Sequence, residues 1–175
     1  MKVSKKIYLL LVPCAICLVI FFSNSSCNIY KFHDRNPIPD TIKTVKVNFI
    51  ENRAQYVNPQ FGPRLTDKLR QKIIGQTKLS QTNSDNPDWE ISGFVTDYSF
   101  STSAISGQQV TNNRLTIAVH ITFNKRKQDK VEEYDVSHSF EFSATKSIQQ
   151  AELELNDEMV RSLTDEIFNK LFSQW

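Results

Sequence analysis

Alternating apolar residues predict several strands in this chain. Val45, Val47 and Phe49 alternate with polar residues over positions 44–50, which is typical of a half-buried strand. Residues 115–123 are apolar at every second position, and residues 134–142 repeat this pattern. A polar connection over residues 125–130 joins these two runs, so together they predict a β-hairpin.

The segment 89–102 also predicts a strand, but its apolar residues change parity. Trp89, Ile91 and Val95 are odd-numbered, whereas Phe94, Tyr98 and Phe100 are even-numbered. This change predicts either a strand buried on both faces or a β-bulge near Gly93. The next stretch, residues 101–113, is uncharged and is interpreted as a long loop, a kind of segment that often carries function.

Two helices are predicted from apolar residues spaced by three or four positions. The first is expected to begin at Asn58-Pro59 and to end near Gly75. The second follows a capping box formed by Ser147 and Gln150. The apolar stripes are Phe61, Leu65, Leu69 and Ile73 in the first helix, and Ile148, Ala151, Leu155, Met159, Leu163, Ile167 and Leu171 in the second.

The order of these elements predicts an α+β fold. We expect a two-layer sandwich, with two helices packed on one face of a mostly antiparallel or mixed sheet of about four strands. Residues 43–175 are expected to form a single α+β domain, because a chain of this length can bury a substantial core without further support.

The first 26 residues have the pattern of an export signal. Three lysines precede sixteen uncharged, mostly apolar residues at positions 7–22, and small residues then lead to Cys27. This arrangement resembles the lipobox of bacterial lipoproteins, which implies that residues 1–26 are removed and that Cys27 is acylated. Residues 27–42, which include two prolines, are then the lipidated N-terminus and tether. The alternative is an uncleaved anchor, but sixteen residues are fewer than the roughly 20 that a spanning helix needs.

Loss of the signal would change both the cysteine content and the charge. Cys14 and Cys17 lie within the signal, so a mature chain with a lipidated Cys27 has no thiol for a disulfide, a nucleophile or a metal site. The full chain has 21 basic and 19 acidic residues, and removing three lysines leaves 18 against 19, a net charge of −1. The basic isoelectric point of the precursor therefore does not indicate nucleic-acid binding.

No catalytic or cofactor motif is present in the sequence. The three histidines, His33, His120 and His138, lack the spacing of a metal site, and the four glycines form no phosphate-binding loop. The carboxylates do not fall into a recognisable acid–base pair. We therefore expect no metal and no cofactor.

A basic cluster at residues 125–127 is the most evident candidate for binding. Lys125, Arg126 and Lys127 lie at the expected hairpin turn. They are interpreted either as a solvated turn, which is the preferred interpretation, or as contacts for phosphates of a lipid headgroup or polysaccharide core.

The order of several short segments resembles the LptE family, the lipopolysaccharide-assembly lipoproteins of the outer membrane. The matching segments, in chain order, are residues 27–32 (CNIYKF), 49–52 (FIEN), 58–59 (NP), 65–69 (LTDKL), 76–79 (QTKL), 89–93 (WEISG), 113–117 (NRLTI) and 163–170 (LTDEIFNK). Together they cover essentially the whole chain from Cys27 onward.

This resemblance implies a protein without enzymatic activity that is lipid-anchored to the periplasmic leaflet of the outer membrane. It implies a plug inside a large β-barrel partner that delivers lipopolysaccharide to the cell surface, and a role in assembling that barrel. Candidate lipopolysaccharide contacts, chosen by position and charge, are Arg114, Lys125, Arg126 and Lys127; the candidate partner-contact loop contains Ser103, Ile105, Gln108 and Val110. The alternative function is a periplasmic, lipid-anchored binding or adaptor protein outside lipopolysaccharide transport.

Overall fold

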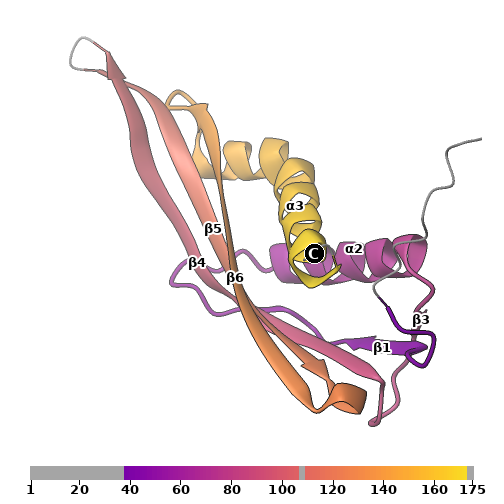
Figure 1. Cartoon of the computed structure of the whole chain (residues 1–175). Coiled ribbons are helices and arrows are strands. Elements are labelled where there is room, and N and C mark those ends of the chain that lie inside the picture. The colour runs from indigo at the N-terminus through magenta and orange to yellow at the C-terminus, as the bar shows by residue number, and fades with distance from the viewer. Residues whose placement is uncertain (1–37, 107–108, 173–175) are drawn as a thin grey trace, which may run out of the picture. The chain divides into compact units, whose positions relative to one another are not determined.

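The computed structural model describes residues 38–106 and 109–172 of the chain (Figure 1). The predicted signal peptide and Cys27 lie outside these residues. The elements in chain order are β1 (Thr44–Val47), β2 (Glu51–Asn52), α2 (Phe61–Gln76), β3 (Ser80–Gln81), β4 (Trp89–Ser106), β5 (Gln109–Lys125), the 3-10 helix η1 (Arg126–Gln128), β6 (Lys130–Ser143) and α3 (Ile148–Phe172). Before β1, the side chains of Ile38 and Ile42 are both buried in the core.

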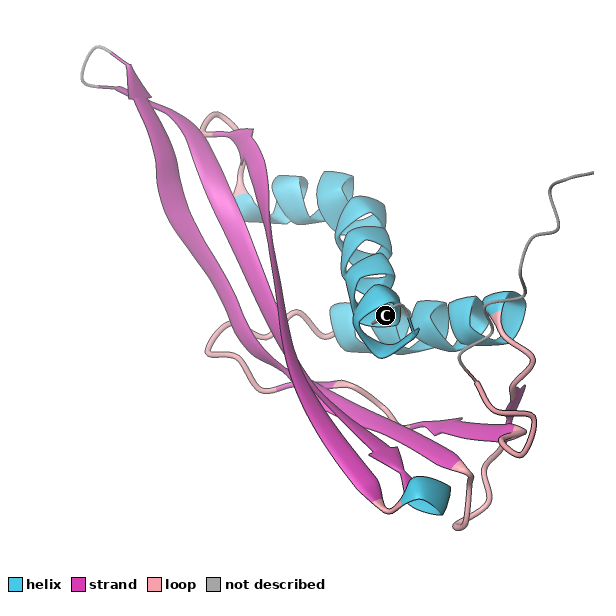
Figure 2. Cartoon of the chain, in the orientation of Figure 1, coloured by secondary structure: helices cyan, strands magenta, loops and turns pink. Residues whose placement is uncertain are grey.

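The strands form one mixed sheet in the order β3-β1-β4-β5-β6, and β2 also pairs with β4. The short strands β1, β2 and β3 run parallel to their partners, whereas β4, β5 and β6 form an antiparallel meander. Both helices lie on one side of this sheet (Figure 2). The predicted α+β architecture is therefore confirmed. The sheet has six strands, whereas about four were predicted. The sequence did not indicate β2 and β3 because two residues are too few to produce a periodic pattern.

The core lies between the helices and the inner face of the sheet. The predicted stripe of α2 is fully buried, as are the alternate apolar residues of β5. These residues are Phe61, Leu65, Leu69 and Ile73 in α2 and Leu115, Ile117, Val119, Ile121 and Phe123 in β5. Each such side chain contributes about 1.5–3 kcal/mol to folding, so this interface dominates the stability of the fold.

A β-bulge at Thr96 explains the parity change in β4. Val95 pairs with Val119 and Asp97 with the adjacent Ala118, which leaves Thr96 as an extra residue. Apolar residues before and after Thr96 therefore both face the helices, although their parity differs. The alternative of a strand buried on both faces is wrong, and the bulge lies three residues beyond Gly93. At Gly93 itself, a Cβ atom would lie 2.4 Å from the main-chain oxygen of His120, so glycine permits the close approach of β5.

The stretch 101–113 is not a long loop. β4 continues to Ser106 and β5 begins at Gln109, so the stretch forms the end of an extended β-hairpin. Register shifts after Thr102 and Ala104 mark two further irregularities in this hairpin. β6 ends at Ser143, opposite Asn112, so the β4–β5 pair continues beyond the third strand. The sequence predicted a loop here because these residues are mostly polar or small and show no apolar alternation. Such residues are nevertheless compatible with a strand.

The helix ends follow local hydrogen bonding. The predicted capping box of α3 is confirmed, because Ser147 and Gln150 each accept a hydrogen bond from the other's main-chain N–H, at 3.2 and 3.1 Å. α2 begins at Phe61, two residues after the predicted first helical residue, and it ends at Gln76, where the Thr77 hydroxyl donates to the carbonyl of Ile73. Among the described residues, no helix combines the length and apolarity needed to cross a bilayer.

Candidate functional site

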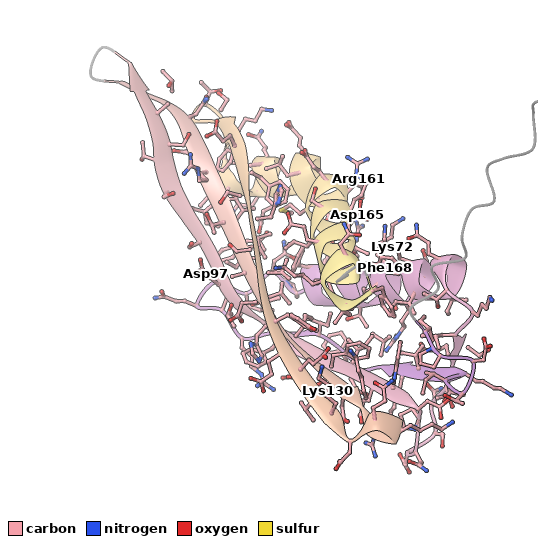
Figure 3. The ribbon with its side chains drawn as sticks, viewed as in Figure 1. Lys72, Asp97, Lys130, Arg161, Asp165 and Phe168 are labelled. Atoms are coloured by element: carbon pink, nitrogen blue, oxygen red, sulfur yellow. The ribbon has the colours of Figure 1, made fainter. Side chains whose placement is uncertain are left out.

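The outer face of the β4–β5–β6 meander carries a polar surface, and we call it the open face. Cross-strand pairing places its residues in five rows: Ser92, Thr122 and Glu133; Phe94, His120 and Asp135; Asp97, Ala118 and Ser137; Ser99, Thr116 and Ser139; and Ser101, Arg114 and Glu141. Figure 3 shows Asp97 on the side of the sheet opposite the helices. Apart from Phe94 and Ala118, every side chain in these rows is polar.

Cross-strand contacts stabilise the open face. Thr116 and Ser139 share a hydrogen bond of 3.0 Å, and the His120 ring lies 2.8 Å from the carboxylate of Asp135. The Phe94 ring packs against the His120 ring in a tilted arrangement, with 5.4 Å between ring centroids, and the guanidinium of Arg53 lies 4.5 Å above the Phe94 ring. The Phe94 ring is thus partly covered, which leaves a surface suited to polar contacts.

The candidate basic residue Arg114 lies on the open face near the hairpin end. Its guanidinium donates to Glu141 at 3.1 Å, and its side chain remains 45% exposed. An exposed pair of this kind contributes little to stability, so the guanidinium can exchange Glu141 for another anion at small cost.

The predicted partner-contact loop is part of the hairpin. Ser103 and Ile105 lie on β4 and Val110 lies on β5, whereas Gln108 is outside the described residues. Ser103 is the unpaired residue between the pairs Thr102–Asn113 and Ala104–Asn112. Its hydroxyl is buried and has no hydrogen-bond partner within the described part of the chain. The structure therefore places Ser103, Ile105 and Val110 within the paired strands, with Ser103 at a bulge.

The basic cluster at residues 125–127 lies at the other end of the meander and is neutralised by acidic neighbours. Lys125 contacts Glu132 at 2.7 Å, Arg126 pairs with Glu90, and Lys127 contacts Asp88 at 2.7 Å. Sequence reasoning missed two of these partners, because Glu90 and Asp88 lie 36 or more positions earlier in the chain. The geometry agrees with the preferred interpretation of a charged turn.

The acidic partners of this cluster have lowered pKa values. Burial acts to raise the pKa of Glu132, but hydrogen bonds from Lys125, Lys130 and Tyr134 more than offset it and lower the pKa to about 2. Burial likewise opposes ionisation of Asp88, yet Lys127 and the main-chain N–H groups of residues 43 and 44 hold its pKa well below the usual range. These carboxylates stay ionised: Glu132 joins the end of β5 to β6, and Asp88 joins Lys127 of η1 to the start of β1.

The structure does not bring Arg114 and the basic cluster together. Lys125 is eleven residues further along β5, which corresponds to roughly 36 Å at about 3.3 Å per residue. The four candidate lipopolysaccharide contacts therefore belong to two separate surfaces.

A second polar site, missed by sequence reasoning, surrounds Glu152 in the first half of α3. Its carboxylate accepts hydrogen bonds from Tyr98 at 2.8 Å, Asn58 at 3.0 Å and Tyr56 at 3.1 Å. Burial raises the pKa of Tyr98 well above its ordinary value, and the carboxylate of Glu152 raises it further. A cavity of about 270 Å³ adjoins this network, next to the exposed side chains of Val57 and Leu153. No local pattern could reveal it, because its members come from three distant segments.

The described residues contain no cluster of His, Asp and Glu side chains that could hold a metal ion. His120 lies against Asp135, and His138 lies 2.6 Å from Glu166 of α3. His33 is outside the described residues. Each of the two described histidines thus has one carboxylate partner.

Comparisons with known proteins identify the family and the fold. Sequence comparison with curated proteins finds no significant match. Among solved structures, the rare lipoprotein B from Shewanella oneidensis is similar, with a TM-score of 0.50, 13% identity, and coverage of 74% of this chain and 93% of that one. A hypothetical protein from Chlamydia trachomatis has a TM-score of 0.52, 11% identity, and coverage of 74% and 95%.

At these identities the solved structures show a shared fold. The family assignment comes from a match between residues 42–171 and the family model described as LptE, lipopolysaccharide-assembly. This match spans β1 to α3, and therefore every surface described above. The chain belongs to the LptE family of lipopolysaccharide-assembly proteins.

Proposed function

We propose that this protein is a lipid-anchored component of the outer membrane that occupies a large β-barrel translocon for lipopolysaccharide and assists its assembly. Family membership supports the role in lipopolysaccharide assembly. The finer statements, which are the anchor at Cys27, the periplasmic leaflet and the barrel partner, are part of the proposal.

The open face is the observation that carries the barrel contact. It is a surface three strands wide, polar in all but two of its row positions, and uncovered by either helix. The interior of a large outer-membrane barrel is also polar and lined by strands. Two such surfaces can meet through side-chain hydrogen bonds and bridging waters, without a large apolar patch that would cause aggregation before assembly.

The hairpin end extends this contact, and Arg114 supplies its basic residue. Ser101, Ser103 and Arg114 lie close to where the β4–β5 pair passes beyond β6. We assign lipopolysaccharide phosphate to Arg114 in preference to Lys125, Arg126 and Lys127, because each residue of the cluster is engaged by a carboxylate whose pKa is lowered.

Site-specific crosslinking in cells tests the proposed contact. A photoreactive amino acid at Ser139 or Ser103 is expected to give adducts with one very large outer-membrane protein, identified by mass spectrometry. A matched probe at Lys170, exposed on the helix side, reports background. If the probes at Ser139 and Ser103 give no barrel adduct, or give only a soluble or inner-membrane partner, the adaptor function outside lipopolysaccharide transport replaces this proposal.

Two further measurements test the anchor and the pathway. Metabolic labelling with a clickable fatty acid should mark the wild type and not Cys27→Ser. Depletion of the protein should lower lipopolysaccharide at the cell surface. Unchanged surface levels with a correctly folded barrel would contradict the translocon role.

A further inference from the structure

The interface between α2 and α3 carries a ladder of charged residues. Residues four apart lie on the same side of a helix, so three positions on each helix form matching rows. The rows are Arg64, Lys68 and Lys72 in α2, and Asp157, Arg161 and Asp165 in α3. The outer rungs are ion pairs: Arg64 lies 3.5 Å from Asp157, and Lys72 lies 2.8 Å from Asp165.

The central rung of this ladder holds two cations. Lys68 and Arg161 line the same groove from opposite helices, and both are exposed. Neither makes an ion pair with any residue that the structure describes. Figure 3 shows Arg161 and Asp165 on the side of α3 that faces Lys72 of α2. If the ladder served only to join the helices, an acidic residue would be expected at one of these two central positions.

The groove around this rung has room for an anion and carries cationic side chains. Its volume is about 410 Å³, and Val160, 7% exposed, contributes the apolar part of its lining. The side-chain amide of Gln71 supplies a further donor. Two carboxylates also line the groove, but Asp67 is paired with Arg70 at 3.3 Å and Asp157 is paired with Arg64. The unmatched charge is therefore positive.

We propose that Lys68 and Arg161 form a binding site for a phosphate group, either as a free anion or on a lipid headgroup. The planar guanidinium of Arg161 can donate two parallel hydrogen bonds, and the ammonium of Lys68 adds a point charge with three donors. A phosphate carries up to two negative charges on several oxygens, which matches the two unpaired cations better than a single carboxylate does. This site lies on the helix layer, so it does not depend on the proposed barrel contact through the open face.

Calorimetric titration of the full-length chain in detergent with pyrophosphate tests the site. The variant Lys68→Gln/Arg161→Gln should bind at least about tenfold more weakly, because both charge-assisted contacts are lost. The matched control is Lys78→Gln, which removes an exposed lysine just beyond α2 and outside the groove; it should bind within about twofold of wild type. Equal binding by wild type and the double variant, or equal loss in the control, would overturn the proposal.

The same titration with soluble dihexanoyl phosphatidic acid distinguishes the two sources of phosphate. Binding that is stronger than to pyrophosphate, and that is lost in the double variant, assigns the site to a lipid headgroup. Binding of pyrophosphate alone, with the same loss in the double variant, assigns it to a free anion. Binding of neither ligand by wild type refutes the proposal.

Lys68→Glu separates binding from stability. A glutamate at this position would face Arg161 and complete the ladder, so the melting temperature without phosphate should be equal to or higher than that of wild type. Pyrophosphate binding should nevertheless be lost. A lowered melting temperature together with unchanged pyrophosphate binding would show that Lys68 has a structural role and would contradict the proposed site.

Discussion

The bulge at Thr96 gives a sharp test of how β4 is built. Thr96 and Ser99 are both exposed polar residues of the same strand, so their deletion removes little direct packing. Deleting Thr96 converts the bulge into regular pairing and leaves Tyr98 and Phe100 facing the helices. Deleting Ser99 instead shifts the parity after the bulge, so that Tyr98 or Phe100 must turn to the open face.

The structure sets the size of the difference. Phe100 contacts three aromatic rings, Tyr56, Tyr98 and Phe142, at centroid distances of 5.4, 5.9 and 6.3 Å. Turning it outward loses about 1.5–3 kcal/mol of burial and about 0.5–1.5 kcal/mol for each of the three ring pairs, which gives about 3–7.5 kcal/mol in total. A domain of this size has about 5–15 kcal/mol of stability, so the deletion of Ser99 removes a large part of it. The deletion of Thr96 should lower the free energy of unfolding by at most about 2 kcal/mol.

Chemical denaturation with urea measures both variants. The midpoint should fall steeply for the Ser99 deletion and little for the Thr96 deletion, with similar denaturant slopes. The variant Thr96→Ala controls for side-chain loss and should lie within about 0.5 kcal/mol of wild type, because the residue is exposed. Equal destabilisation by the two deletions, or a larger effect of deleting Thr96, would refute this account of the strand.

Three further predictions concern single residues. Gly75→Ala should stabilise the domain by about 0.5–1 kcal/mol because nothing lies within 4 Å of the new Cβ, whereas Gly62→Ala should cost more than about 2 kcal/mol because its Cβ would lie 2.5 Å from a main-chain oxygen. Tyr98→Phe should cost about 1.5–3 kcal/mol, since the hydroxyl donates to the carboxylate of Glu152 at 2.8 Å. The pKa of Glu132 falls from its ordinary 4.5 to about 2, so the stability it contributes is complete above pH 4.5 and is lost as the pH falls towards 2; Glu132→Gln should cost about 1–2 kcal/mol at pH 7 and almost nothing at pH 2.

Each of these outcomes has a clear opposite. Thermal unfolding of the two glycine variants compares the same substitution in one helix, and a similar shift for both would contradict the calculated Cβ contacts. For Tyr98→Phe, an unchanged urea midpoint would show that the bond to Glu152 adds no net stability. For Glu132→Gln, a penalty that stays constant between pH 7 and pH 2 would exclude ionisation of this carboxyl as its cause.

Local patterns in the sequence were sufficient for most of the fold. The stripe of α2, the stripe of α3 from Ala151 onward and the alternation of β5 were recovered because burial on one side of an element imposes a period on consecutive residues. Ile148, the predicted first member of the α3 stripe, is exposed instead. Residues 101–113 were misassigned because strand pairing holds polar residues there, and main-chain hydrogen bonds leave no mark on apolar periodicity. The two-residue strands β2 and β3 were missed because each is too short to produce a periodic pattern.

The candidate site was recovered less completely. Arg114 and the basic cluster could be chosen by charge, but only the register of β5 shows that they lie at opposite ends of one strand. Their acidic partners, the Glu152 network and the ladder between α2 and α3 join residues separated by as many as 96 positions. Such contacts follow from how helices and strands pack together, and no short window of sequence contains them.

The sequence by itself determined the class of the fold, the family resemblance and the residues available for chemistry, because composition and local period act within a few residues. The tertiary structure decided which of those residues share a surface. It placed the bulge at Thr96, it made one face of the sheet almost wholly polar, and it set Lys68 beside Arg161 in one groove. These outcomes depend on sheet register and on the packing of α2 against α3, which are set by the whole core rather than by any one segment.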